Sequence, residues 1–291
     1  MTADASIAGL LDANRPPQID ILRTVVRAFS QSPAVTQLLI RGSLNAGRAD
    51  RSSDVDLVVC AQPGALPRII ENIDCIIRTS VGCLFSGWPD AVAPDLGGAG
   101  FVFLVPFEGG LYELDIYVAT ASAAPAIVAR GATVIYERVD ERGDAGSRWE
   151  TAGAEPSIPG DGDPVRALIV EVLVVFHLLS KRVARGQSFI VYGYLYLLND
   201  AIRRLIKHQL APRSRHWGWY HLEDDLSFKP RGKRCLDELA GLVNTSPNIH
   251  ASDLPRTFAR IARIAELATG DLWAEMAHEV EAYRYYLGVQ E

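Results

Sequence analysis

The chain has 291 residues, a length that suits one large domain or two medium-sized ones, and we expect two. Hydrophobic residues make up 48% of it and charged residues 22%, which is typical of a globular protein and excludes a disordered chain. Lys and Arg number 29 and Asp and Glu number 35, so the net charge is −6. An acidic chain is poorly suited to binding duplex nucleic acid through its phosphates and better suited to a cationic or neutral partner.

Cysteine usage and hydropathy predict a cytoplasmic protein with no membrane partner. The four cysteines form no C-x-x-C pair and are too sparse for a disulfide scaffold, so we expect reduced thiols. The first residues lack a basic segment followed by an apolar one, which is the pattern of a signal peptide. The longest apolar stretch, residues 167–179, is too short to span a bilayer and contains Glu171 and His177. It predicts a buried helix.

The first half of the chain alternates predicted helices and strands. Apolar residues at helical spacing predict a helix over residues 19–29, and β-branched residues predict strands over 35–41 and 55–60. A polar, glycine-containing stretch separates these two strands. The later elements, in chain order, are a helix over 66–73, a strand over 75–79, a loop or insertion over 88–100, a hairpin of strands 101–106 and 111–118 joined by a tight turn at Gly109 and Gly110, and a strand over 133–137.

Composition changes after the last predicted strand. Residues 151–164 are rich in Gly, Pro and small side chains, as in a linker. Everything that follows has helical periodicity, and helices are predicted over 165–185, 192–209, 232–243 and 254–287. The expected fold class is therefore α+β, with a mixed sheet flanked by helices over residues 1–155 and an all-helical domain over residues 156–291.

The segment between the first two strands contains candidate phosphate and metal ligands. Gly42 and Ser43 come where a strand ends, and a glycine there lets backbone N–H groups approach a phosphate closely, with the serine hydroxyl as a further donor. Asp54 and Asp56 begin the next strand. Because residues i and i+2 of a strand face the same way, their carboxylates project side by side. Carboxylates in that arrangement suit a hard cation such as Mg²⁺, without which they repel each other.

A third carboxylate is expected from a neighbouring strand. Asp115 lies in an otherwise apolar strand, and Glu113 shares its face by the same period of two. Asp54, Asp56 and Asp115, three carboxylates from two strands, predict a site for one or two Mg²⁺ ions that handle a nucleoside triphosphate. Asp115 has two candidate roles, metal ligand and general base. Glu113 is either the second candidate for these roles or a solvated carboxylate at the strand edge.

This combination of Gly-Ser, a spaced acidic pair and a later acidic strand residue resembles the nucleotidyltransferase superfamily that shares the polymerase β palm. The whole chain is most similar to the antibiotic nucleotidyltransferases that act on aminoglycosides and lincosamides, which also have a helical C-terminal domain. The resemblance implies that Asp54, Asp56 and Asp115 are catalytic metal ligands. It also implies that Gly42 and Ser43 bind the nucleotide. Residues 44–46 depart from the family pattern, because members often carry a basic residue soon after Gly-Ser.

A segment around Lys181 resembles part of the second domain of these enzymes, which makes this lysine a candidate contact for the triphosphate. Glu223 and Asp224, which follow several aromatic residues, are candidate contacts for a cationic acceptor, and Glu113 is a further candidate for binding this substrate. The alternative is that these two acidic residues charge the start of a helix, where negative charge is favourable.

The function implied by the resemblance is Mg²⁺-dependent transfer of a nucleoside monophosphate, AMP from ATP, to a hydroxyl of a small molecule. The acceptor would be an aminoglycoside-like antibiotic, and pyrophosphate would be released. One alternative keeps this chemistry but uses a protein side chain or an RNA end as the acceptor. A further alternative is a non-catalytic regulator that binds a nucleotide on the same fold.

Overall fold

The computed structural model describes residues 17–90, 98–138 and 162–289. The chain divides into two compact units, Met1–Asp161 and Gly162–Glu291. The first contains a mixed sheet flanked by helices, and the described part of the second is helical, which confirms the predicted α+β class. The predicted domain boundary between residues 155 and 156, and residues 151–161 of the predicted linker, lie outside the described residues.

The sheet of the first unit places the predicted acidic strands next to each other. Its six strands have the order β3-β4-β5-β2-β1-β6, and only the central pair, β2 and β5, is parallel. Their bounds are β1 (Val35–Ile40), β2 (Val55–Ala61), β3 (Trp88–Pro89), β4 (Ala99–Phe107), β5 (Gly110–Thr120) and β6 (Thr133–Glu137). The start of β2 therefore lies beside the middle of β5, where Leu114 pairs with Val55.

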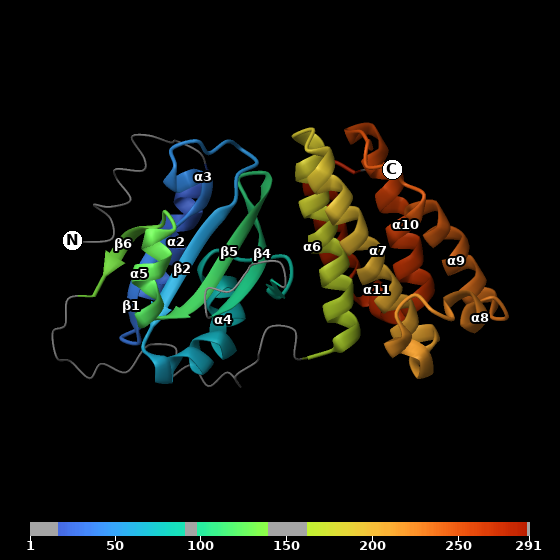
Figure 1. The fold of residues 1–291 in the computed structure, drawn as a ribbon, viewed down its shortest axis with the longest axis horizontal. Coiled ribbons are helices and arrows are strands. Elements are labelled where there is room, and N and C mark those ends of the chain that lie inside the picture. Colours follow the sequence, from blue (N-terminus) through green and yellow to red (C-terminus); the bar gives the residue numbers. More distant parts are fainter. Residues whose placement is uncertain (1–16, 91–97, 139–161, 290–291) are drawn as a thin grey trace. The chain divides into compact units, whose positions relative to one another are not determined.

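The two faces of the sheet are covered unequally (Figure 1). Helices α2 (Gln18–Ser30) and α4 (Leu66–Ser80) pack on one face in a large apolar core, to which β2 contributes Val55, Leu57 and Val59. On the other face α5 (Ala124–Ala129) packs in a smaller cluster that includes Val58 and Cys60. Because side chains alternate along a strand, Asp56 belongs to the face that carries α5.

Helix α4 replaces two predicted elements. The strand predicted over residues 75–79 is wrong, because a single helix runs from Leu66 to Ser80. Ile69, Ile73, Ile76 and Ile77 are all buried, and their spacing of four, three and one residues forms one helical stripe. The β-branched residues after residue 75 favour a strand locally, but burial of this stripe against the sheet favours the helix.

The predicted hairpin is confirmed, but its turn is made by Glu108 and Gly109, whereas Gly110, which was predicted in the turn, begins β5. Glu108 and Gly109 have φ angles of 45° and 77°, as a two-residue type I′ connection requires. Three short elements were not predicted. They are α3 (Gly42–Asn45) in the polar stretch, β3 in the predicted loop over 88–100, and α5 after β5. Residues 91–97 of that loop lie outside the described residues.

The second unit contains the predicted helices, but the last of them has two breaks that the sequence periodicity does not show. Its helices are α6 (Pro164–Ala184), α7 (Ser188–Leu210), α8 (Leu222–Leu226), α9 (Pro230–Val243), α10 (Leu254–Thr269), α11 (Asp271–Glu275) and α12 (Ala277–Leu287). The single helix predicted over residues 254–287 is therefore wrong. Gly270 has a φ of 56°, which ends α10, and the chain is interrupted again at Met276 before α12 begins.

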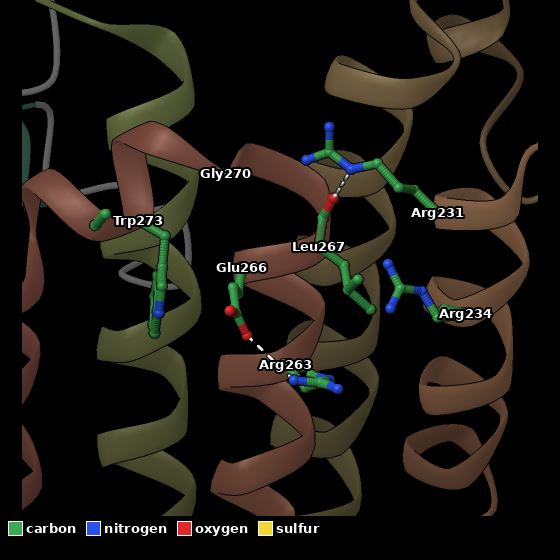
Figure 2. A pocket seen from close by; sticks show the side chains of 8 residues that line it. Arg231, Arg234, Arg263, Glu266, Leu267, Gly270 and Trp273 are labelled. Atoms are coloured by element: carbon green, nitrogen blue, oxygen red, sulfur yellow. Dashed lines mark hydrogen bonds and ion pairs between the residues drawn. The ribbon is translucent and has the colours of Figure 1, made fainter.

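Aromatic packing and main-chain capping join helices of the second unit. The Phe258 ring lies 5.5 Å from that of Phe176 and 5.7 Å from that of Tyr283, whose hydroxyl donates to the carbonyl of Leu173. Nε of Arg231 on α9 donates to the carbonyl oxygen of Leu267 near the end of α10, at 3.0 Å (Figure 2). This bond satisfies one of the carbonyls that a helix end leaves without an intrahelical partner.

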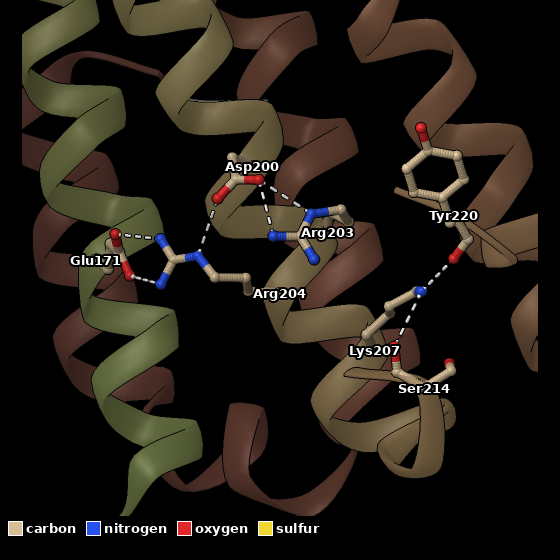
Figure 3. Close-up of polar contacts among 7 residues, drawn as sticks. All are labelled: Glu171, Asp200, Arg203, Arg204, Lys207, Ser214 and Tyr220. Carbon is tan, nitrogen blue, oxygen red and sulfur yellow. Dashed lines mark hydrogen bonds and ion pairs between the residues drawn. The ribbon is translucent and has the colours of Figure 1, made fainter. Parts of the chain in front are cut away.

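A polar network ties α7 to its surroundings (Figure 3). Arg204 on α7 makes a bidentate contact with Glu171 on α6 and also contacts Asp200. Lys207 is fully buried, and its ammonium group donates to the main-chain carbonyls of Ser214 and Tyr220. One buried lysine thus contacts the segment that follows α7 at two points.

Among the described residues, no helix combines the length and the apolar character that crossing a membrane requires.

Candidate metal centre

The acidic residues singled out from the sequence lie on one face of β2 and β5. The two strands are parallel, with Asp56 paired directly with Asp115. Paired residues of adjacent strands project to the same side, and so do residues two positions apart. Asp54 and Glu113 therefore share the face of the pair. Leu57 and Leu114 lie on the opposite face, in the large core.

Three of these carboxylates converge. One oxygen each of Asp54, Glu113 and Asp115 lies within 4.8 Å of the other two, and this is the only such group of three potential metal ligands among the described residues. The Glu113 side chain is only 4% exposed, whereas Asp54 and Asp115 are half-buried. Carboxylate oxygens are the ligands that hard divalent cations prefer, so the donor set fits Mg²⁺.

Asp115 shows that this arrangement is electrostatically costly without a cation. Its Oδ1 is buried and has no hydrogen-bond partner within the described structure. Burial, followed by the negative charges of Asp56 and Asp90, raises the pKa of Asp115 well above its usual value of 3.8, and a side-chain hydrogen bond with Glu113 and the positive charge of Arg41 oppose this shift. A bound cation would supply the missing partner and favour the ionised carboxylate. The orphaned oxygen is the observation that most directly indicates a metal ligand.

Asp56, also a predicted ligand, lies outside the converging group and beside Arg41 and Gly42. Its Oδ1 is 3.7 Å from Nη2 of Arg41, the residue that follows β1. Gly42 has a φ of 68°, and a Cβ built there would lie 1.9 Å from Oδ2 of Asp56. Only glycine leaves room for the carboxylate in this position. The close approach of Asp56 gives Gly42 a structural role that the sequence pattern does not reveal.

The loop that leads from Ser43 to Asp54 is held by specific polar contacts. The main-chain N–H of Arg48 donates to the carbonyl of Ser43, at 3.0 Å. The fully buried Gln18 on α2 donates from Nε2 to the carbonyls of Asp50 and Ser53, at 2.9 and 3.0 Å. Gln18 therefore fixes the chain immediately before Asp54, although it lies in a helix that the sequence predicts only as a packing element.

Two charged residues near the carboxylates were missed by the sequence reasoning. Arg41 is the cation beside Asp56, and Asp90 adds negative charge near Asp115. The main-chain N–H of Asp90 donates to the carbonyl of Gly100, which places the residue at the end of the short β3–β4 ladder. Asp90 lies in the Gly/Pro-rich stretch that was predicted as a loop or insertion, and no periodicity there points to the sheet.

Lys181, Glu223 and Asp224 belong to the second unit. Lys181 lies in the last turn of α6 and is 9% exposed, and its contact with a triphosphate stays a prediction. Glu223 and Asp224 lie in the first turn of α8, and Oδ2 of Asp224 is 3.6 Å from Nδ1 of the exposed His221. Their position agrees with the alternative that they charge a helix start. Whether they also bind an acceptor stays a prediction.

Comparison of the sequence with protein-family models and with curated proteins found no match. The chemical interpretation of the site therefore depends on its residues and their geometry. The described residues provide a face of the sheet where four carboxylates, of Asp54, Asp56, Glu113 and Asp115, are supplied by two adjacent parallel strands. Such a face can hold a divalent cation.

Proposed function

We propose that this protein is a Mg²⁺-dependent nucleotidyltransferase that transfers a nucleoside monophosphate, AMP from ATP, to a hydroxyl of a small cationic molecule such as an aminoglycoside-type antibiotic. The observation that supports this most strongly is the convergence of Asp54, Glu113 and Asp115, while the neighbouring Asp56 carboxylate lies against Gly42. These three carboxylates are the proposed ligands of the ion, and Asp56, the strand partner of Asp115, is the further candidate.

The proposed reaction forms a bond between the acceptor oxygen and the α-phosphorus and breaks the bond from that phosphorus to the pyrophosphate. A bound Mg²⁺ would supply positive charge for the phosphate oxygens. Ser43 and the backbone N–H groups of its turn are the proposed donors to the phosphates. The acceptor hydroxyl loses its proton, and Asp115 is the proposed general base. A bound cation favours the ionised form of this carboxylate, and the ionised form is the one that can accept the proton.

The direct test is a transfer assay with the purified full-length chain. The protein is incubated with Mg²⁺, each nucleoside triphosphate in turn, and a panel of aminoglycosides and lincosamides. Pyrophosphate release and the mass of the acceptor are measured together. We expect release with at least one triphosphate, and a mass gain of one nucleoside monophosphate on the antibiotic. Asp54→Asn and Asp115→Asn should abolish both signals, whereas Glu108→Gln, on the exposed turn of the same hairpin, should retain them.

Three results would contradict the proposal in different ways. Absence of pyrophosphate release with every acceptor, including protein and RNA, would favour a non-catalytic nucleotide-binding protein. Release only with a protein or RNA acceptor would keep the chemistry and overturn the small-molecule acceptor. Full turnover in Asp54→Asn and in Asp115→Asn would overturn the assignment of the site itself.

A further inference from the structure

A pocket of about 410 Å³ lies between α9, the end of α10 and α11, entirely within the second unit. Three arginines and one glutamate line it, so its formal charge is +2, whereas the whole chain has a net charge of −6. The lining residues are Arg231, Arg234, Arg263, Glu266, Leu267, Gly270, Trp273 and Ala274. Cationic side chains therefore concentrate in a concave site on an otherwise acidic protein.

The first arginine is held in place by main-chain contacts. Nε of Arg231 donates to the carbonyl of Leu267, and a Cβ built on Gly270 would lie 3.3 Å from its Nη2. The guanidinium group therefore lies close to the backbone where α10 ends. A guanidinium has five N–H donors, and this bond uses only one of them. The guanidinium group of Arg231 is already oriented by this bond, and its remaining donors can contact a ligand.

The other two arginines of the pocket make fewer or weaker polar contacts within the described structure. Arg234 lies three residues after Arg231 on α9, so the two share a side of the helix, and it makes no hydrogen bond or ion pair with any residue that the structure describes. Arg263 on α10 is 3.5 Å from Glu266, and both side chains are more than half exposed, so this pair is weak. Figure 2 shows the three guanidinium groups around the side chain of Leu267.

We propose that this pocket binds a small anion that carries phosphate, with two or more negative charges. The planar fork of a guanidinium matches the oxygens of a phosphate, and each contact is assisted by charge. Neighbouring guanidinium groups repel one another, and a polyanion between them would relieve that repulsion. Leu267 and Trp273 offer apolar surface to the carbon part of such a ligand. The inference uses no residue of the carboxylate group, so it is independent of the proposed function.

The test is calorimetric titration of the full-length chain with inorganic pyrophosphate and with inorganic phosphate, in the presence of EDTA so that no metal is bound. The test variant is Arg234→Gln/Arg263→Gln, which removes one arginine from each of α9 and α10. The matched control is Lys233→Gln/Arg256→Gln, which removes two exposed cations from the same two helices outside the pocket. Melting temperatures verify that both double variants are folded. Citrate serves as an anion without phosphate.

We expect saturable binding of pyrophosphate at one site, tighter than that of phosphate. The Kd should rise at least tenfold in the test variant and change less than twofold in the control. Absence of saturable binding to the unaltered chain would overturn the proposal, and so would equal weakening in the two double variants, which would indicate only general surface charge. An unchanged Kd in the test variant would show that the anion binds outside this pocket and would overturn the proposal. Citrate binding as tight as that of pyrophosphate would overturn the phosphate assignment.

Discussion

Asp56 on β2 and Asp115 on β5 are directly paired across two parallel strands, yet their carboxylates have different surroundings. Asp115 joins Asp54 and Glu113 in a group of three and has one buried oxygen without a hydrogen-bond partner. Asp56 instead lies next to Arg41 and Gly42. Both face the same side of the sheet, so the difference comes from the residues beside each carboxylate. Arg41, which follows β1, lies beside Asp56, whereas Glu113 lies two residues before Asp115 on the same strand.

The first prediction concerns metal binding. Replacing Glu113 by Gln removes the buried carboxylate of a proposed metal ligand while retaining its shape, and we expect the Kd for Mn²⁺ or Mg²⁺ to rise at least tenfold. Glu108→Gln removes the same charge from the exposed turn of the same hairpin and should change the Kd less than twofold. Calorimetric titration of the two variants measures this. Equal affinity in both would show that Glu113 is not a ligand.

The second prediction concerns Gly42. Alanine at this position meets the Asp56 carboxylate and also requires a φ of 68°, so we expect the carboxylate to move and transfer activity to fall at least tenfold. Gly109→Ala carries a comparable strain at φ 77° with nothing within 4 Å of the new Cβ, and should retain activity. The backbone strain alone should lower the free energy of unfolding by about 1–2 kcal/mol in each variant, and chemical denaturation measures this loss. Equal activity in the two variants would show that the close contact between Gly42 and the Asp56 carboxylate is not needed for activity.

The third prediction concerns the pH dependence of stability that arises from Asp115. Its pKa in the folded chain is raised above the usual value of 3.8, chiefly by burial. Between these two values the folded chain retains a proton that the unfolded chain has lost, so the free energy of unfolding falls as pH rises through this window. Asp115→Asn should remove this fall, and Asp237→Asn on the exposed surface of α9 should not. Urea denaturation from pH 4 to pH 8 without divalent ions measures the difference, and parallel curves for all three proteins would contradict the prediction.

The fourth prediction concerns His177, which lies in α6 with both ring nitrogens buried and without hydrogen-bond partners in the described structure. Burial lowers its pKa from 6.5 to about 4. Between these values the unfolded chain binds a proton that the folded chain does not, so stability is lost as pH falls from 6.5 towards 4. The shift corresponds to a loss on the order of 3 kcal/mol.

The measurement is urea denaturation of the unaltered chain, His177→Leu and His278→Leu between pH 4 and pH 7.5. His177→Leu should lose this part of the pH dependence. His278 is exposed on α12, and its replacement should leave the pH dependence as it is. An unchanged pH profile in His177→Leu would show that this histidine is not the group responsible.

The fifth prediction concerns Lys207, whose ammonium group donates to the carbonyls of Ser214 and Tyr220 (Figure 3). Lys207→Met removes both charge-assisted bonds and leaves two carbonyls without this donor, which should lower the free energy of unfolding by about 3 kcal/mol. Amide hydrogen exchange should become faster over residues 212–221. Lys233→Met on the exposed side of α9 is the control and should change neither quantity. Unaltered exchange over residues 212–221 in Lys207→Met would contradict the anchoring role.

The local elements of the candidate site could be predicted from the sequence because their signals are short-range. The alternation of apolar residues with Asp54 and Asp56 predicts a strand with its acidic side chains on one face. β2 contains Asp56 on the face opposite its core residues, and Asp54 lies immediately before the strand. The hairpin was predicted from its turn glycines for the same reason. The strand predicted over residues 75–79 failed because its β-branched residues belong to an apolar helical stripe, and the choice depends on the surface that buries this stripe.

The sequence by itself determined the fold class and the carboxylates of the candidate site, because periodicity and residue chemistry are local properties of a chain. Only the tertiary structure decided how those carboxylates are grouped. The pairing of β2 with β5 brings Asp54 to Glu113 and Asp115, and the pairing of β2 with β1 brings Arg41 to Asp56. These contacts join residues far apart in the chain. Their geometry is set by strand order and register, which depend on the burial of the whole sheet.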